Sequence, residues 1–177
     1  MKHLQFLYIA FFIFNSAHGQ PSMIDTAIAS VNLRSSAEKM GQLFIEKNYT
    51  LYIKYIHPDI LKMAGGGAKM TELLKKSLNE IEAEGLTFDN VSIGSPSTII
   101  ITKSGLQSVV PQILELKTKD GRLKATSYLV GISGDKGKTW YFMDTSGKTL
   151  VQMQVVFPFL SNDLVIPEKK PPVFLND

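Results

Sequence analysis

The chain contains no cysteine, and two of its three histidines, His3 and His18, lie near its first residue. No disulfide can form, and Cys/His zinc sites and Cys–His nucleophile pairs are excluded. After residue 19 the only histidine is His57, so a Ser-His-Asp triad would have to use it. The sequence therefore predicts neither a metal site nor a cofactor.

An excess of either charge is also missing. The 19 Lys and Arg residues and 16 Asp and Glu residues give a formal net charge of +3 at pH 7. This charge is too small to indicate a nucleic-acid partner or an anionic membrane surface. After the first residues no apolar run is long enough to span a membrane, so none is expected to do so.

The first residues form a pattern typical of a secretory signal peptide. A short basic start, Met1-Lys2-His3, precedes an apolar run from Leu4 to Phe14 and a small, polar end. The run is shorter than the roughly 20 residues that cross a bilayer core, which argues against a membrane anchor. We therefore expect residues 1–19 to be removed between Gly19 and Gln20, and the protein to be exported, either periplasmic or secreted.

Helical periodicity follows in the first half of the remaining chain. It predicts a helix that begins at Ser35 or Ser36, a short helix from Asn48 to Pro58, and a long helix over 68–84. Residues 60–64 fit either a short strand or a helical turn. Gly85 follows the long helix, where glycine commonly ends helices.

After Gly85 the apolar period shortens toward two, which is typical of strands. The expected strands are 86–93, 98–102, 106–118, 122–133 and 138–144. Asp120-Gly121 predicts a hairpin turn, and 147–157 fits a helix or a strand, with helix favoured. The sequence thus predicts an α+β fold: N-terminal helices with one long helix packed in a curved antiparallel sheet of about four to six strands.

Four segments divide the chain. The signal peptide is followed by a weakly patterned segment, 20–34, in which Pro21 and Ser22 could start a helix, and by a single α+β domain, 35–157. The last segment, 158–177, is rich in proline but too apolar for a free linker. We expect it to pack on the domain as far as Pro167 and then to fray.

The order of these elements resembles the nuclear-transport-factor-2-like superfamily of cone-shaped α+β domains, which includes ketosteroid isomerase and polyketide cyclases. The matching features are Tyr55-Ile-His57-Pro58-Asp59, Gly65-Gly66-Gly67 and the strands after Gly85, within 35–157. Many exported bacterial members of the superfamily have no known activity. The resemblance implies a sheet curled around the long helix, with a pocket at the open end. Here the pocket would be lined by Tyr52, Tyr55, His57 and Asp59, with Trp140 or Phe142.

Enzymes of the superfamily use a carboxylate base or a His–Asp pair in that pocket. The isomerase base lies several residues beyond the corner, where this chain has Leu61-Lys62-Met63-Ala64 and no carboxylate. His57 and Asp59 stay candidates for a base and its orienting carboxylate. The alternative is a structural corner in which Asp59 caps the next element and His57 binds a backbone carbonyl, and this alternative is favoured.

Three further motifs have two interpretations each. One helical face carries three tyrosines, Tyr49, Tyr52 and Tyr55. They could form an aromatic wall for a ligand, but such rows more often pack in the core, and core packing is favoured. The glycines at 65–67 could cradle a phosphate, but a hinge is favoured because no Gly-Lys-Ser/Thr ending follows. Residues 133–140 match the Ser-x-Asp-x-Gly-x-Thr-Trp box of sialidase-type propellers. One copy cannot build a propeller, so we expect only its tight turn.

These observations favour an exported binding domain. It would hold a small apolar or sugar-like ligand in the cone, or a protein partner on the sheet face. One alternative is a small cofactor-free isomerase, lyase or hydrolase that uses His57 or Asp59 as its base. The other is a structural module that forms a homodimer through the sheet.

Overall fold

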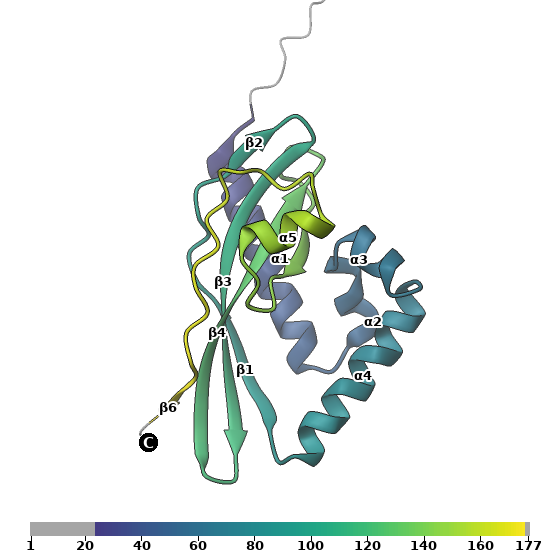
Figure 1. The fold of residues 1–177 in the computed structure, drawn as a ribbon, viewed down its shortest axis with the longest axis vertical. Coiled ribbons are helices and arrows are strands. Elements are labelled where there is room, and N and C mark those ends of the chain that lie inside the picture. Colours follow the sequence, from purple (N-terminus) through teal and green to yellow (C-terminus); the bar gives the residue numbers. More distant parts are fainter. Residues whose placement is uncertain (1–23, 176–177) are drawn as a thin grey trace, which may run out of the picture.

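The computed structural model describes residues 24–175 and confirms the α+β class (Figure 1). Its helices are α1 (Thr26–Ile45), α2 (Tyr49–Tyr52), the 3₁₀ helix η1 (Ile53–Tyr55), α3 (Pro58–Met63), α4 (Gly67–Ala83) and α5 (Leu150–Val156). Its strands are β1 (Thr87–Ile93), β2 (Ile100–Thr102), β3 (Gly105–Thr118), β4 (Gly121–Ser133), β5 (Tyr141–Asp144) and β6 (Val173–Leu175). The expected signal peptide lies outside the described residues. Across 24–175, no helix combines the length and the apolar character that crossing a membrane requires.

The six strands form one antiparallel sheet, in which β1, β3, β4 and β5 are neighbours in that order. β3 and β4 pair over almost their whole lengths, β2 pairs with the start of β3, and β6 pairs with the start of β4. Thr118 lies opposite Gly121, which has a φ of 130°, a value that favours glycine. The turn therefore consists of Lys119 and Asp120, one residue before the expected Asp120-Gly121.

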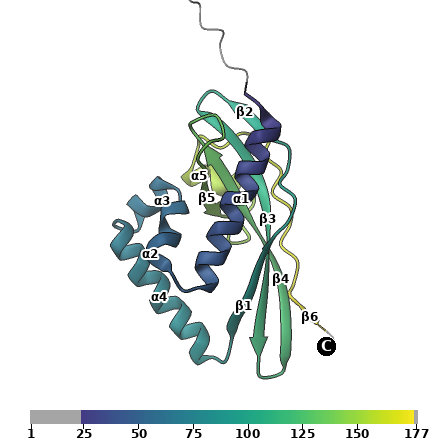
Figure 2. The same cartoon turned by 180° about the vertical axis from the view of Figure 1, so that it is seen from behind.

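Helix α1 covers one face of the sheet (Figure 2). Its buried side chains recur at helical spacing and are Ala29, Leu33, Ala37, Met40 and Leu43. Most of them pack into one core with Leu106, Val110, Leu129, Trp140 and Phe142 from the sheet and its last turn. Gly41 permits the close approach to β1, because a Cβ at this position would lie 2.7 Å from Cγ1 of Val91. Small residues on the helix thus bring it against the strands.

Helix α1 begins at Thr26, so the expected start near residue 35 is wrong. The carboxylate of Asp25 caps the helix by accepting hydrogen bonds from two backbone N–H groups of the first turn, at 3.0 and 3.1 Å. The apolar pattern is blurred here because Ile28 and Val31 are 61% and 67% exposed. The weakly patterned segment is therefore largely helical from Thr26 onward.

The expected long helix over 68–84 is α4, but it does not lie in the curve of the sheet. Of its residues only Leu78 is fully buried, and the helix packs mainly against α2, η1 and α3 (Figure 1). The long helix that packs on the sheet is α1. Residues 60–64 are helical in α3, and Gly65 and Gly66, with φ values of 88° and 102°, form the hinge before α4.

The opposite face of the sheet is covered by α5 and the segment that follows it (Figure 1). The favoured helix over 147–157 is confirmed by α5. Phe157, Leu160 and Leu164 bury Val109, Val130 and Met143 of the sheet. Beyond Pro167 the chain does not fray as expected, because 173–175 pairs with β4 as β6.

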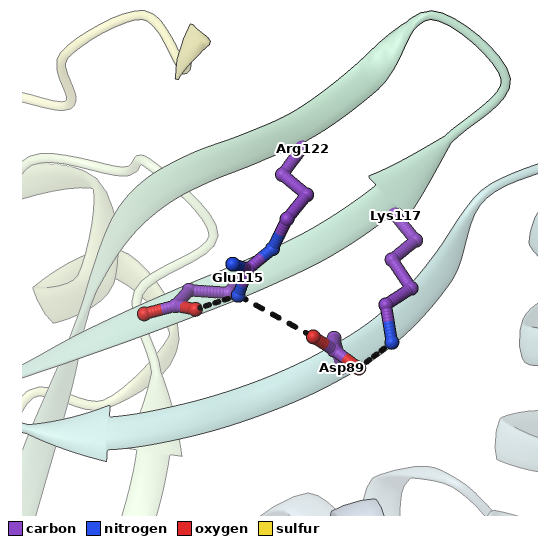
Figure 3. Close-up of polar contacts among 4 residues, drawn as sticks. All are labelled: Asp89, Glu115, Lys117 and Arg122. Carbon is purple, nitrogen blue, oxygen red and sulfur yellow. Dashed lines mark hydrogen bonds and ion pairs between the residues drawn. The ribbon is translucent and has the colours of Figure 1, made fainter. Parts of the chain in front are cut away.

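Four charged side chains join β1, β3 and β4 (Figure 3). Nη2 of Arg122 lies 2.7 Å from a carboxylate oxygen of Glu115 and 3.4 Å from one of Asp89, which also binds Lys117. The hydrogen bond from Lys117 is the main reason why the pKa of Asp89 lies below its usual value. Asp89 sits at a bulge between Phe88 and Asn90, so the network ties the irregular part of β1 to the central hairpin.

Candidate functional site

The structure separates the six expected pocket residues into different settings. Trp140 and Phe142 are each 1% exposed and belong to the core under α1. Tyr52 and Tyr55 are partly buried against this core, while His57 and Asp59 lie at the start of α3. The inside of the curved sheet is thus filled by side chains at this level.

His57 is the N-cap of α3. Its Nδ1 accepts a hydrogen bond from the backbone N–H of Asp59 at 3.3 Å, and its own backbone N–H donates to the carbonyl of Phe142 at 3.0 Å. The ring stacks on Phe159 at a centroid distance of 5.5 Å and meets the edge of Tyr141. His57 therefore joins α3 to β5 and to the segment after α5.

The His-Pro-Asp corner is structural, but the expected roles are wrong: His57 rather than Asp59 caps α3, and its imidazole accepts a hydrogen bond from a backbone N–H instead of binding a backbone carbonyl. Because Nδ1 is a hydrogen-bond acceptor, it carries no proton that the Asp59 carboxylate, 3.8 Å away, could accept. The side chain of Asp59 is 53% exposed. Burial lowers the pKa of His57, and the nearby carboxylate opposes this shift only in part. The imidazole is thus held neutral as a structural acceptor.

The three tyrosines at positions 49, 52 and 55 have different surroundings: two pack in the interior and one reaches a surface groove. Tyr49 and Tyr52 pack against Phe44, which in turn meets Phe88 of β1 at a centroid distance of 5.0 Å. Burial, with a smaller effect of the Asp144 charge, raises the pKa of Tyr52 well above its usual value. These two tyrosines act as packing residues, and Tyr55 is the one that reaches the groove described below.

The box at residues 133–140 forms the tight turn that its spacing predicts. The Asp135 carboxylate accepts hydrogen bonds from the hydroxyl of Ser133 at 2.8 Å and from the backbone N–H groups of Lys138 and Thr139 at 3.1 and 2.8 Å. Nε1 of Trp140 donates to the Gly137 carbonyl at 3.2 Å. The turn therefore fixes residues 138–140 relative to the core.

One wall of a surface groove is made by this turn. The groove has a volume of about 380 Å³ and lies between α1, the α2–η1 segment and the residues that lead into β5. It is lined by Ser36, Lys39, Leu43, Leu51, Lys54, Tyr55, Lys138, Thr139, Trp140 and Tyr141. We call it the lysine groove. Tyr55 and Trp140 are the two expected pocket residues that the structure brings together here.

Three lysines and no carboxylate line the lysine groove. Lys39 donates a hydrogen bond to the neutral side chain of Gln42 at 3.0 Å. Lys54 and Lys138 form no ion pair within residues 24–175. The apolar part of the lining comes from aromatic rings and leucines, so the groove combines a hydrophobic floor with a positive rim.

Two other depressions differ in chemistry. A cavity of about 490 Å³ between α1 and β1 is lined by both charges, including Arg34 paired with Glu38. A smaller one of about 230 Å³ between α3 and α5 is mainly apolar, with Met63, Met153 and Phe157. In the described part of the chain, no three His, Asp or Glu side chains gather as metal ligands.

Sequence reasoning missed the lysines of the groove and Tyr141. The three lysines stand on three separate elements, and no local spacing relates them. The one usable signal was the box, because it predicts a fixed turn next to Trp140. Comparisons with known proteins add no assignment: no protein-family model and no curated protein matches the chain.

Proposed function

We propose that this protein is an exported binding domain that holds a small ring-shaped ligand in the lysine groove. The observation that carries the proposal is the lining itself, in which Tyr55 and Tyr141 lie beside two leucines and the buried Trp140. Aromatic side chains offer flat faces on which sugar and aromatic rings can pack. The volume of about 380 Å³ lies within the usual range of small-molecule sites.

The proposal keeps a sugar-like ligand but moves its site from the interior of the cone to its flank. Trp140 and Phe142 fill the interior, whereas the groove lies at the edge of the core, beside Trp140, and opens to solvent. The resemblance to the nuclear-transport-factor-2-like superfamily and the signal-peptide pattern remain expectations that accord with the proposal.

The sheet face has weaker support as a site for a partner or for a second copy. Its central part is buried by α5 and the segment that follows, through Phe157, Leu160 and Leu164. An enzyme based on His57 has weaker support too, because Nδ1 is engaged in the cap of α3. The lysine groove is thus the better candidate for function.

A panel of uncharged ring compounds, namely methyl glycosides and aromatic alcohols, tests the proposal by NMR titration of the ¹⁵N-labelled protein. We expect saturable shifts of the backbone resonances at 54–55 and 138–141. Tyr55→Leu keeps an apolar side chain without the aromatic face and should weaken binding about two- to tenfold, since aromatic packing contributes about 0.5–1.5 kcal/mol.

Tyr128→Leu is the matched control, because Tyr128 is partly buried and does not line the groove. This variant should bind as the unmodified protein does. If no compound of the panel shifts the groove resonances, or if Tyr55→Leu binds with unchanged affinity, the proposed function is wrong.

A further inference from the structure

The three lysines of the groove approach it from three separate elements. Lys39 belongs to α1, Lys54 to η1 and Lys138 to the turn before β5, and all three are exposed. Residues far apart in the sequence thus place like charges around one concave surface. Like charges in a concavity raise the local positive potential and attract anions.

Some cations elsewhere on this protein are paired with acidic side chains, whereas others, such as Lys75, form no ion pair in the described residues. Lys47 binds Glu82, Lys117 binds Asp89, and helix α4 pairs Lys69 with Glu72 at 2.9 Å. The lining of the lysine groove offers no such partner, because it contains neither aspartate nor glutamate. The positive charge of the groove is therefore left without a neutralising group from its own lining.

The carboxylate nearest to Lys138 in the preceding sequence does not neutralise the charge of the groove. Asp135 lies three residues before Lys138, but Oδ1 of its carboxylate is occupied by the Ser133 hydroxyl and by the backbone N–H groups of Lys138 and Thr139. These hydrogen bonds hold the turn rather than the ammonium group. The box thus places Lys138 at the groove, while the Asp135 carboxylate accepts hydrogen bonds from the backbone of the turn.

We propose that the ligand of the lysine groove is anionic, a sugar ring that carries a carboxylate, such as a hexuronate. This inference rests on the proposed function and specifies its ligand class. The aromatic floor accepts the ring, and the lysines at the rim bind the carboxylate. Lysine is a compact charge on a flexible stem, so the rim selects for negative charge and the floor selects for the ring.

The test compares galacturonate with its uncharged amide, galacturonamide, by NMR titration of the full protein at low and high salt. At low salt the acid should bind at least fivefold more tightly than the amide. Lys54→Gln and Lys138→Gln should each weaken binding of the acid about two- to fivefold, the usual range for an exposed ion pair. High salt should reduce the preference for the acid, and binding of the amide should not change.

Lys75→Gln is the control variant, because Lys75 lies exposed on α4, away from the groove, and forms no ion pair in the described residues. It should bind the acid as the unmodified protein does. Equal binding of acid and amide at the groove would overturn the inference and leave the proposed function standing. If neither probe binds, the inference is wrong, and the uncharged panel alone decides the proposed function. An equal loss in Lys75→Gln would also refute the inference, because the effect would then follow net charge.

Discussion

Replacing Asp135 tests the box most directly, because one carboxylate oxygen accepts three hydrogen bonds there. Its partners are the Ser133 hydroxyl and the backbone N–H groups of Lys138 and Thr139, at 2.8 to 3.1 Å. A net value of about 1 kcal/mol for each bond predicts a loss of about 3 kcal/mol in Asp135→Ala. For a chain of this size that corresponds to a fall of about 6–12 °C in Tm.

The assay is urea unfolding followed by tryptophan fluorescence. Trp140 is the only tryptophan of the chain, is 1% exposed and lies beside the box, so its emission reports loss of this region. Asp120→Ala is the matched control, because the Asp120 carboxylate accepts no hydrogen bond within the described residues. A loss below about 0.5 kcal/mol in Asp135→Ala, or an equal loss in the control, would refute the reasoning.

The pH dependence gives a second test of the same site. Burial is the largest influence on the pKa of Asp135 and raises it, but the hydrogen bonds from Thr139, Ser133 and Lys138 outweigh it and bring the pKa below 3.8. The charged carboxylate therefore stabilises the fold above the unfolded-state pKa, and this contribution is lost as pH falls through the folded-state pKa. The difference in unfolding free energy between the unmodified protein and Asp135→Asn should shrink between about pH 5 and pH 2.

Three further predictions concern the packing around the site. Gly137→Ala should lower stability by about 2 kcal/mol or more in thermal unfolding, because φ is 83° and the new Cβ would lie 2.4 Å from the Cβ of Ala29. Gly134→Ala is the control: a Cβ at Gly134 has no neighbour within 4 Å, so stability should change by less than about 0.5 kcal/mol. Gln107→Leu should speed proteolysis of the segment after α5, because the buried amide holds it through two hydrogen bonds at 3.0 and 2.8 Å; unchanged cleavage would contradict this role. Burial lowers the pKa of His57 in the folded state. The neutral imidazole therefore stabilises the fold fully above the unfolded-state pKa of about 6.5, and this stabilisation is lost as pH falls through the folded-state pKa. His57→Asn should remove this pH-dependent loss in unfolding titrations.

Sequence patterns predicted those elements that are stabilised by interactions between residues close together in the sequence. The box spacing predicts its turn because Asp135 bonds only to residues within four positions. Helix α4 was predicted almost to the residue because it has one apolar side, charged residues on the other and Gly85 after its end. In both cases the physical cause lies within a few residues of the signal.

Which helix packs on the sheet could not be predicted in the same way. An apolar stripe on a helix indicates that this face is buried, but it does not identify the element that buries it. Helix α4 has a stronger contrast between its apolar and polar sides than α1, so the sequence pattern favoured α4. Helix α1 reaches the sheet through Ala29, Ala37 and Gly41, whose importance is the close approach that they allow. Such shape complementarity depends on the partner surface and leaves little periodic signal.

Only part of the lining of the candidate site could be named from the sequence, because the rest depends on how distant elements come together. Tyr55 and Trp140 were named as pocket residues and do line the groove, whereas Phe142 fills the core. The lysines were missed because single lysines are common on any surface. Only their convergence from three elements gives them a shared role, and that convergence is a property of the fold.

The contact between Asn32 and the Gly137 carbonyl, at 2.9 Å, joins residues 105 positions apart. The β3–β4 hairpin closes through a two-residue turn, so its pairing is local, whereas docking of α1 on the turn before β5 must close a very long loop. Contacts of such separation carry a high loop-closure cost in folding. Residues of α1 and of this turn both line the lysine groove, so the groove exists only while α1 is docked on the turn. A ligand held there would favour the docked state, so slower amide hydrogen exchange in α1 would report its presence.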